Sequence, residues 1–573
     1  MSDNDNNLIK EINECYQEAT QTFSSYKTEA GECHKFYLSK QWDDADYNEA
    51  KKKKVPALNL NLIKKNVDVL VGLQKQNRSD IVVHPVEGSD QITCDVLSST
   101  IKWVMSSQNA EYAISDAYKD EVIGGLGWLS CYIDYRKDPL HGDIIIRKKN
   151  AFNITPDPHL TQRDLSDAGY IFEHALVSKK QLKVMYPDYA KAIEDAKGTA
   201  LTSNSEYKHN EIRLDRNKHL QVKEFWFRDI EKRQFIINTL DPSDVVEWTL
   251  DDTRLKLLLA ENPHFKVIKK DAEVMKLRIL VGDNMLVYND KSPYGSTLYP
   301  FIPLWGFFDS SHDRWEEKLE GIVKVLKDPQ REKNKRRSNI MLAINSMPHA
   351  LWIGDKGAVD DNSKLTRAGA GAKYIEKNPG RTLTKVDPPG MPSGLFQLEQ
   401  MFSNDIQQFG VNPEMLGQLN SSADTGKTIQ LRLQQGLATV SELPDNLSFA
   451  VKMLGDKIIE LIREKFTVEK IQRICGTDVI VPPDFEERIK NAKYDCEVDE
   501  VSYSPTRRMQ IYSQLTEQRQ YGIPVPYESI VEYMSVPAKE KDKLLADYQK
   551  QQQQAMQMQA AQAMAQIPQG AIQ

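Results

Sequence analysis

Two helical stretches that flank a segment rich in glycine and proline constrain this chain more than any other feature. Residues 321–346 are typical of one long helix that is basic on one side, and residues 395–409 are typical of a second helix. Residues 347–394 hold many Gly and Pro residues and only weak apolar alternation, which predicts a small irregular β module. The order therefore predicts a stalk that projects from a larger body. A soluble enzyme rarely needs such a stalk, whereas a subunit of a ring with a stem does.

The body that precedes this stalk mixes helical and strand signals. Apolar residues recur at steps of three and four over residues 8–39, and residues 90–123 also favour a helix. Residues 128–134 alternate and are followed by a hairpin partner at 142–147, and residues 220–290 are rich in strand signals. We therefore expect an α+β fold. The length of 573 residues suggests roughly three or four domain-sized units.

The chain after the stalk is mostly helical. A polar loop is expected over residues 411–428, followed by a long helix over residues 429–466 that Pro444 could break. The last 70 residues favour helices and end in the uncharged, glutamine-rich segment Gln551–Gln573. Alanine and methionine at helical spacing in that segment fit a thin helix that packs with copies of itself, and disorder fits equally well.

Charge and composition limit the classes of function. With 75 Lys and Arg against 82 Asp and Glu, the net charge is −7. Tight sequence-specific DNA binding usually needs a basic protein, whereas weak contact with sliding DNA does not. No window is apolar enough to span a membrane, and no secretory signal opens the chain. The six cysteines include no CxxC pair, which predicts free thiols in a reducing cytoplasm rather than a zinc site or disulfides.

Nucleotide-binding motifs are incomplete. Thr425–Thr428 resembles the end of a phosphate-binding P-loop, but Ser421 stands where that loop needs a glycine. Gly125 and Gly127 are followed by Ser130 where a dinucleotide fingerprint needs a third glycine. A flexible polar loop and a turn are the preferred interpretations.

A local acidic cluster comprises Asp157, Asp164 and Asp167. A metal-dependent nuclease could use such carboxylates, but Asp157 lies in a proline-rich turn, where aspartate is favoured for backbone reasons. We therefore expect capping or turn roles. The sequence predicts no catalytic residue, no metal ligand and no cofactor, and so no enzyme.

The first helix of the expected stalk is strongly basic. Between Lys324 and Arg337 lie seven cations against Asp328 and Glu332, a local charge of +5. One interpretation is a solvated helix face with ion pairs between successive turns. The other is a face that meets DNA phosphates or an acidic neighbouring subunit. The residues alone do not favour either.

Several short patterns occur together in one order along the chain, and each is weak by itself. The patterns are Val55–Asn61, Gly72–Arg78, His84–Val86, Gly125–Trp128, Thr155–Pro158, Asp164–Ala168, Pro300–Leu304, Gly321–Val323, Asp328–Ser338, and Ala423–Ile429 followed by Arg432 and Gly436. In this order they resemble the portal proteins of short-tailed bacteriophages, over most of residues 30–470.

The resemblance implies a portal fold and a division of the chain. The implied parts are a wing (1–320), a first stem helix (321–346), a clip (347–394), a second stem helix (395–411), a channel or tunnel loop (412–428), a wing helix with return strands (429–499), a helical crown (500–548) and a glutamine-rich tail (549–573). The C-terminus looks short for a long helical barrel, so only a short barrel is expected there.

The same resemblance implies a function and a set of partners. Subunits of this family form a dodecameric ring at one capsid vertex, through which double-stranded DNA is packaged and ejected without sequence specificity. The expected partners are the major capsid protein, a scaffolding protein, the terminase large subunit, and later head–tail adaptor or tail proteins. The expected location is the portal vertex of the virion, after assembly in the host cytoplasm.

The residues expected to face the DNA channel or a subunit interface are cationic. They are Lys333, Lys335, Arg336, Arg337 and Lys427. The alternatives are a packaging-associated nuclease or ATPase, which would need an intact carboxylate cluster or P-loop, and a head–tail adaptor, which is usually far shorter.

Overall fold

The structure is a computed structural model that describes most of the chain. The described residues are 3–196 and 218–346 apart from gaps at 54, 86–90, 137, 141, 240–244, 249–251 and 263, then 351–355, 373–377, 383–386, 393–410, 440–475, 482, 485, 489, 494–500, and 505–550 apart from 523, 535–539, 542, 546 and 549. The expected tunnel loop, the P-loop-like segment and the tail from Gln551 therefore lie outside the described residues.

A three-stranded antiparallel sheet and two helices form the centre of the body. The strands β10 (Phe301–Trp305), β2 (Leu126–Asp134) and β3 (Asp143–Lys149) follow in that order. Both α5 (Ala110–Gly124) and α14 (Glu442–Lys465) pack against them. The hairpin of β2 and β3 confirms the expected strand pair.

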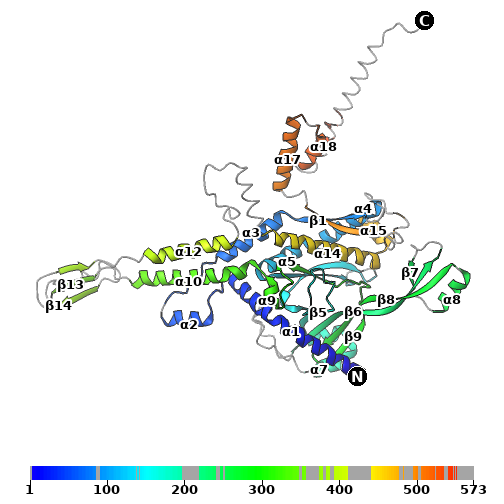
Figure 1. Cartoon of the computed structure of the whole chain (residues 1–573), viewed down its shortest axis with the longest axis horizontal. Coiled ribbons are helices and arrows are strands. Elements are labelled where there is room, and N and C mark those ends of the chain that lie inside the picture. The colour runs from blue at the N-terminus through cyan, green and yellow to red at the C-terminus, as the bar shows by residue number, and fades with distance from the viewer. Residues whose placement is uncertain are drawn as a thin grey trace, which may run out of the picture.

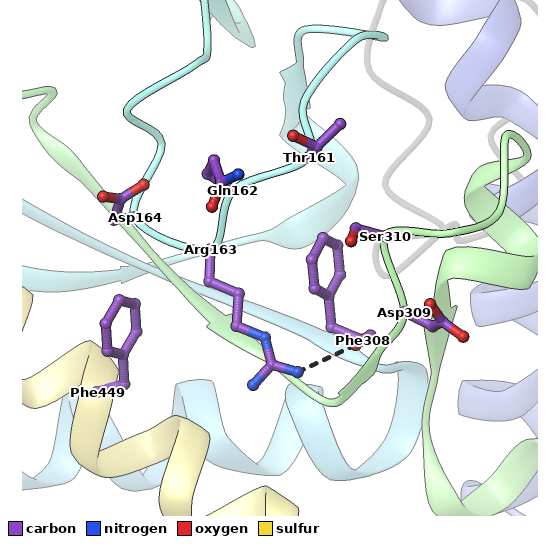
Figure 2. Close-up of a pocket in the computed structure, with 8 residues that line it drawn as sticks. All are labelled: Thr161, Gln162, Arg163, Asp164, Phe308, Asp309, Ser310 and Phe449. Carbon is purple, nitrogen blue, oxygen red and sulfur yellow. Dashed lines mark hydrogen bonds between the residues drawn. The ribbon is translucent and has the colours of Figure 1, made fainter.

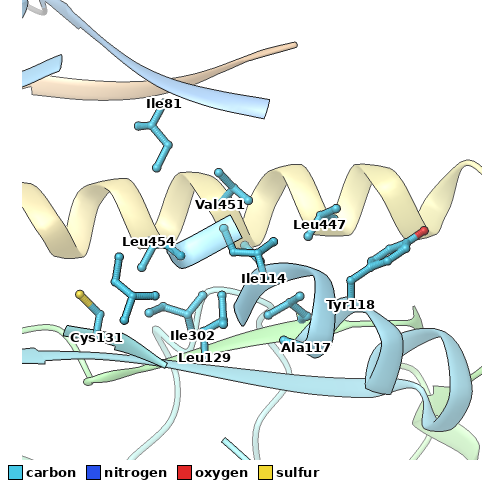
Figure 3. Packing of buried hydrophobic residues seen from close by; sticks show 14 of the residues in the cluster. Ile81, Ile114, Ala117, Tyr118, Leu129, Cys131, Ile302, Leu447, Val451 and Leu454 are labelled. Atoms are coloured by element: carbon cyan, nitrogen blue, oxygen red, sulfur yellow. The ribbon is translucent and has the colours of Figure 1, made fainter. Parts of the chain in front are cut away.

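The largest apolar core lies between α14, α5 and this sheet (Figure 3). Leu447, Val451 and Leu454 occur one turn apart along α14, so they share one face of the helix. They lie toward Ile114 of α5 and Leu129 of β2. This arrangement fixes a late segment of the chain on a much earlier one.

A larger antiparallel sheet forms the second part of the body. Its strands are, in order, β4 (Ile154–Pro156), β5 (Tyr170–Ser178), β6 (His219–Asn238), β8 (Phe265–Val281) and β9 (Met285–Lys291). The 35-residue helix α1 (Asp3–Tyr37) packs on it through Ile9, Ile12 and Ala19, which meet Phe172 and Phe225. Both the helix and the strand-rich region were expected from the sequence.

The ribbon of β6 and β8 extends beyond this sheet as an arm. The two strands pair from Val222 and Val281 out to Asn238 and Phe265, whereas β5 pairs with β6 only as far as Phe227. In the described part of the chain the outer ribbon is joined by β7 (Val245–Trp248) and α8 (Asp252–Glu261), and it lies at the edge of the molecule (Figure 1).

The stalk projects from the opposite side of the body (Figure 1). Its helices α10 (Ile322–Ser346) and α12 (Ser393–Phe409) lie side by side. At its far end, β13 (Leu351–Asp355) pairs in parallel with β14 (Lys373–Lys377) and antiparallel with β15 (Leu383–Val386). Helix, β module and helix therefore occur at the residues where the sequence predicts them.

Early and late segments of the chain meet at the remaining side of the body. The strand β1 (Ser79–Pro85) pairs antiparallel with β16 (Tyr494–Glu500). Of the described helices, α4 (Gln91–Ser107) and α14 contact these strands, and α15 (Val468–Cys475) packs on α4. Elsewhere, α3 (Leu62–Gln76) packs against α5 and α10, α2 (Asp44–Lys52) lies beside α10, and α17 (Pro505–Gln520) packs against α18 (Tyr527–Tyr533). The remaining short elements are η1 (Ala151–Asn153), α6 (Lys179–Met185), η2 (Pro187–Tyr189), α7 (Ala190–Asp195), β11 (Phe307–Phe308), α9 (Trp315–Lys318) and β12 (Leu319–Glu320).

Two local predictions need correction. The single helical stretch expected over 90–123 is two helices, because Asn109 adopts a left-handed φ of 52° between α4 and α5. Pro444 does not break α14, because it lies in the first turn, where no N–H of its own is needed.

No helix in the described ranges combines the length and the apolar character needed to cross a membrane.

Candidate functional site

The basic helix α10 binds carboxylates of its own chain. Lys327 is 9% exposed and lies between Glu29 and Glu32 of α1, with Nζ 2.5 and 3.0 Å from their oxygens. Burial alone would lower the pKa of Lys327, but the hydrogen bonds that Lys327 donates to Glu29 and Glu32, together with the charge of Glu29, outweigh burial, so that pKa is raised. A solvated face is therefore the wrong interpretation at this position.

Two of the expected site residues bind the second stalk helix. Lys333 donates from Nζ to the Ser403 hydroxyl of α12 over 2.6 Å, and the Arg337 guanidinium contacts both oxygens of Glu399 at 2.8 and 3.0 Å. Lys333 is 9% exposed, and its burial lowers its pKa despite the Glu399 charge nearby. These contacts tie α10 to α12.

Lys335 and Arg336 face other partners. The Nζ of Lys335 lies 2.7 Å from Asp46 of α2, and a nitrogen of Arg336 lies 3.6 Å from Glu332, one turn earlier on α10. Lys427 is outside the described residues. The structure thus places four of the five residues on α10, each beside an acidic or hydroxyl partner in the same chain.

The sequence analysis missed a polar ladder on the same helix. Gln330, Asn334 and Ser338 occur one turn apart, and all three side chains are buried. Their side-chain oxygens accept hydrogen bonds from the backbone N–H groups of Leu62, Leu60 and Leu58 over 3.1, 3.0 and 3.1 Å. We call residues 55–61 the strap, because this extended segment is held along α10.

The ladder explains why two distant patterns occur together. The strap is the Val55–Asn61 pattern, and the ladder lies within Asp328–Ser338. An extended segment without a neighbouring strand leaves backbone N–H groups that need acceptors, and polar side chains spaced by four residues supply them. That spacing was the available signal, but the surrounding cations obscured it.

Glycines fix the foot of the stalk. Gly125 has a φ of 86°, and its carbonyl accepts from the N–H of Gly306 over 2.8 Å. A Cβ on Gly306 would lie 2.6 Å from the carbonyl oxygen of Glu320, and one on Gly321 would meet the backbone of Ile123. The backbone therefore crosses itself just before α10 begins, which gives a physical reason for glycine in both the Gly125 and the Gly321 patterns.

The acidic cluster serves its own loop, as the turn interpretation predicts. Asp157 accepts hydrogen bonds from the N–H groups of His159 and Gly169, and Asp167 accepts from Thr161 and Gln162. Asp164 accepts from the N–H of Ser166. Across the described ranges, no group of three or more His, Cys, Asp or Glu side chains is placed to hold a metal ion.

A pocket of about 380 Å³ opens beside this loop (Figure 2). Arg163 crosses it and donates to the Phe308 carbonyl over 3.0 Å, to Asn446, and to Glu442 over 3.0 Å. Phe449 and Asp309 line the rim. Arg163 already donates to three groups of its own chain, two of which belong to the first turns of α14. Its main role is therefore to hold the loop with the acidic cluster against the start of α14.

Comparison with known protein families gives a match over nearly the whole chain. The family described as phage P22-like portal protein matches residues 13–573. Its members are structural proteins of the phage virion that assemble as oligomers and act in genome packaging. The match includes the stalk, the strap and the glycine contacts described above. The chain belongs to the family of phage P22-like portal proteins.

Proposed function

We propose that this chain is one subunit of a dodecameric portal ring at a single capsid vertex, through which double-stranded DNA enters and leaves the head. The observation that carries the proposal is the stalk, in which two long helices hold a small sheet away from the body. In a closed ring, such stalks stand side by side and surround a channel.

The parts of the chain then take the roles expected from the sequence. The body up to residue 320 is the wing, α10 and α12 form the stem, and β13, β14 and β15 belong to the clip. Residues 412–428 are the tunnel loop, α17 and α18 belong to the crown, and the glutamine-rich tail forms a short barrel at most.

The partners follow from these roles. The clip binds the terminase large subunit during packaging and adaptor or tail proteins afterwards. The wing contacts the major capsid protein, and the scaffolding protein guides the ring into the shell during assembly in the host cytoplasm.

Channel electrostatics follow from ring symmetry, because each position appears once per subunit. Lys333, Lys335, Arg336 and Arg337 of α10 and Lys427 of the tunnel loop are proposed to face the channel or a neighbouring subunit. The described cations bind partners of their own chain, so they produce only a weak net positive potential in the channel. Weak, sequence-blind attraction suits DNA that must slide.

Negative-stain imaging of the purified chain tests the ring. We expect closed rings with a central hole, seen end-on. A purified protein that stays monomeric at micromolar concentration, with or without scaffolding protein, would contradict the proposal.

A pair of variants separates a channel role of the cations from a stem-packing role. Lys335, Arg336 and Arg337 are replaced together by alanine, and packaged DNA per capsid is measured. The matched variant Glu399→Gln breaks the Arg337 ion pair but keeps the cation. If the cations act in the channel, only the triple variant should package less DNA. If they act by packing the stem, both variants should package less DNA. Unchanged packaging in both variants, with intact rings, would rule out both roles.

A nuclease or ATPase is not favoured by any observation. The oxygens of Asp157 and Asp167 already accept backbone N–H groups. The length and the stalk also distinguish the chain from a head–tail adaptor.

A further inference from the structure

The larger sheet sorts charged side chains onto its two faces. Glu173 of β5 lies directly opposite Glu224 of β6, and the next pair along the strands is His174 opposite Lys223. Because successive side chains of a strand point to opposite faces, the two carboxylates lie on one face and the two basic side chains on the other. Lys149 binds Glu173 on the acidic face.

The basic face is covered by α1. The Tyr16 ring of this helix meets the rings of Phe172 and His174 edge-on, with centroids 5.3 and 6.0 Å apart. Lys27, further along α1, reaches into the same seam, where its Nζ donates to the Thr155 hydroxyl over 3.0 Å. Thr155 is fully buried and belongs to β4, the strand next to β5.

Lys27 has no acidic partner in the described part of the chain. Its ammonium has three donors, of which Thr155 takes one, and it also lies 5.4 Å from the centre of the Phe23 ring. Desolvation lowers the pKa of Lys27 to about 8. A desolvated ammonium with unused donors and no counter-charge is costly, so a ligand that supplies negative charge would stabilise it.

His174 presents a second unused group in this seam. Its Nδ1 is shielded from solvent and has no hydrogen-bond partner within the described ranges. Burial, reinforced by the charges of Lys27 and then Lys223, lowers the pKa of His174 to about 3, so the ring is neutral. A neutral imidazole can still donate one N–H, from the nitrogen that carries the proton.

Lys223 is already neutralised by Asp283, so the unpaired positive charge in the seam belongs to Lys27. Its Nζ lies 3.0 Å from the Asn13 side-chain oxygen, 2.9 Å from Asp283 and 4.4 Å from the centre of the Tyr16 ring. Asp283 is the one carboxylate among the described residues that pairs with any of these three basic groups, and its side chain is 73% exposed. Glu173 and Glu224 are held on the other face of the sheet.

We propose that the seam between α1 and β5 binds a small inorganic anion, a halide or inorganic phosphate, held by the ammonium of Lys27 and the ring N–H of His174. The proposal does not depend on the ring or on DNA, because every group involved belongs to one subunit. Bound there, the anion fastens the first helix to the sheet of the body.

Direct localisation is the first test. The assembled full-length protein is crystallised in sodium bromide, and an anomalous map is calculated. We expect a bromide peak within hydrogen-bond distance of Lys27 Nζ. The proposal is overturned if the map has no bromide peak there and crystals grown in sodium phosphate show no phosphate density there either. A carboxylate of a second copy in that position overturns it as well.

Thermal unfolding is the second test, and it separates halide from phosphate. The midpoint Tm is measured in rising sodium chloride or sodium phosphate, with sodium gluconate keeping the ionic strength constant. Above the dissociation constant we expect Tm to rise by about 1 °C per tenfold increase in the concentration of the anion that binds. A Tm that rises equally in gluconate contradicts a specific site.

Variants assign the effect to the seam. Lys27→Met should abolish the anion-dependent rise, and Lys27→Arg should keep it. Lys148→Met is the matched control, because Lys148 forms an ion pair with Asp120 at 2.6 Å. The anion-dependent rise in Tm should be unchanged in this variant. A full rise in Lys27→Met overturns the proposal. Should that variant fail to fold, the bromide and phosphate maps of the unaltered protein decide.

Discussion

Glu224 lies directly opposite the Glu173 carboxylate on one face of the larger sheet. Burial and the charge of Glu173 raise the pKa of Glu224 to about 7, against the smaller opposing effects of Lys149 and of the hydrogen bond from the Trp226 indole. Lys149 is bound to Glu173. One lysine cannot neutralise two carboxylates, so a proton bound to Glu224 favours the folded state.

Replacing Glu224 by glutamine should change how stability depends on pH. In the unfolded chain this carboxyl titrates near 4.5. Its contribution is therefore fully present below that pH and is lost as the pH rises through about 7. Glu224→Gln should unfold at a similar urea concentration at pH 4.5, and should be more stable than the parent at pH 8, by up to about 3 kcal/mol. Equal pH profiles would contradict the raised pKa.

Gly306 is one of the glycines at the foot of the stalk where the backbone leaves no room for a side chain. Gly306→Ala should lower stability by about 3 kcal/mol, because the new Cβ meets the backbone of both Glu320 and Gly125. Gly72→Ala is the control, since a Cβ there meets nothing within 4 Å in the interior of α3, and it should gain about 0.5–1 kcal/mol. Chemical denaturation followed by tryptophan fluorescence measures both. A stability loss well below about 3 kcal/mol in Gly306→Ala would show that the backbone can shift where it crosses itself before α10.

At the scale of elements, the sequence predicts the helices and strands that carry regular periodicity. The stalk helices, α1, the hairpin of β2 and β3, and the strand-rich region all occur where expected. The break between α4 and α5 could not be predicted, because Asn109 marks it without a glycine or proline. The position of the strap could not be predicted either, because the strap has no periodicity of its own and is held by side chains of α10.

The ladder that holds the strap can be tested at its middle residue. Asn334 accepts from the N–H of Leu60 and donates to Gln41, and it is 1% exposed. Asn334→Ala should lower stability by about 2–4 kcal/mol, because it leaves buried polar groups without partners.

Arg336→Ala on the same helix is the matched control for Asn334→Ala. It removes only a pair within one helix at 3.6 Å and should cost about 0.5 kcal/mol or less. Equal losses in the two variants, measured by urea denaturation, would show that the strap is not held by the ladder.

At the scale of the whole molecule, the arm is set apart from the rest of the body. Ile236 and Leu255 are buried within it, whereas Ile230 is 69% exposed. Lys276 and Lys291 bind Glu231 at its base, and Lys276 also binds Asp229. This ion-pair group marks the boundary at which the ribbon leaves the sheet.

Removing the arm should leave the body folded. Residues 232–271 are replaced by an Asn-Gly turn that joins Glu231 to Ala272, which face each other in the ladder. We expect the Tm of the body to stay within about 2 °C, because the large cores lie elsewhere. Calorimetry measures the Tm, and a larger fall would show that the arm stabilises the sheet.

The portal function could be anticipated from the sequence only in part. The stalk and the incomplete nucleotide motifs indicate a structural subunit, and the ordered patterns indicate the family, which the match over residues 13–573 confirms. The partners of Lys333, Lys335 and Arg337 could not be predicted, because Ser403, Asp46 and Glu399 come from helices that only the tertiary fold brings to α10. The number of subunits and the path of DNA remain predictions.

The pairing of β1 with β16 has a consequence for biosynthesis. The strand β1 leaves the ribosome well before β16, the strand that completes its ladder, has been made. Until then β1 lacks that hydrogen-bonded neighbour, and contacts so distant in sequence form slowly. A truncated polypeptide thus cannot close this side of the body. This side of the body would then close only after β16 has been translated.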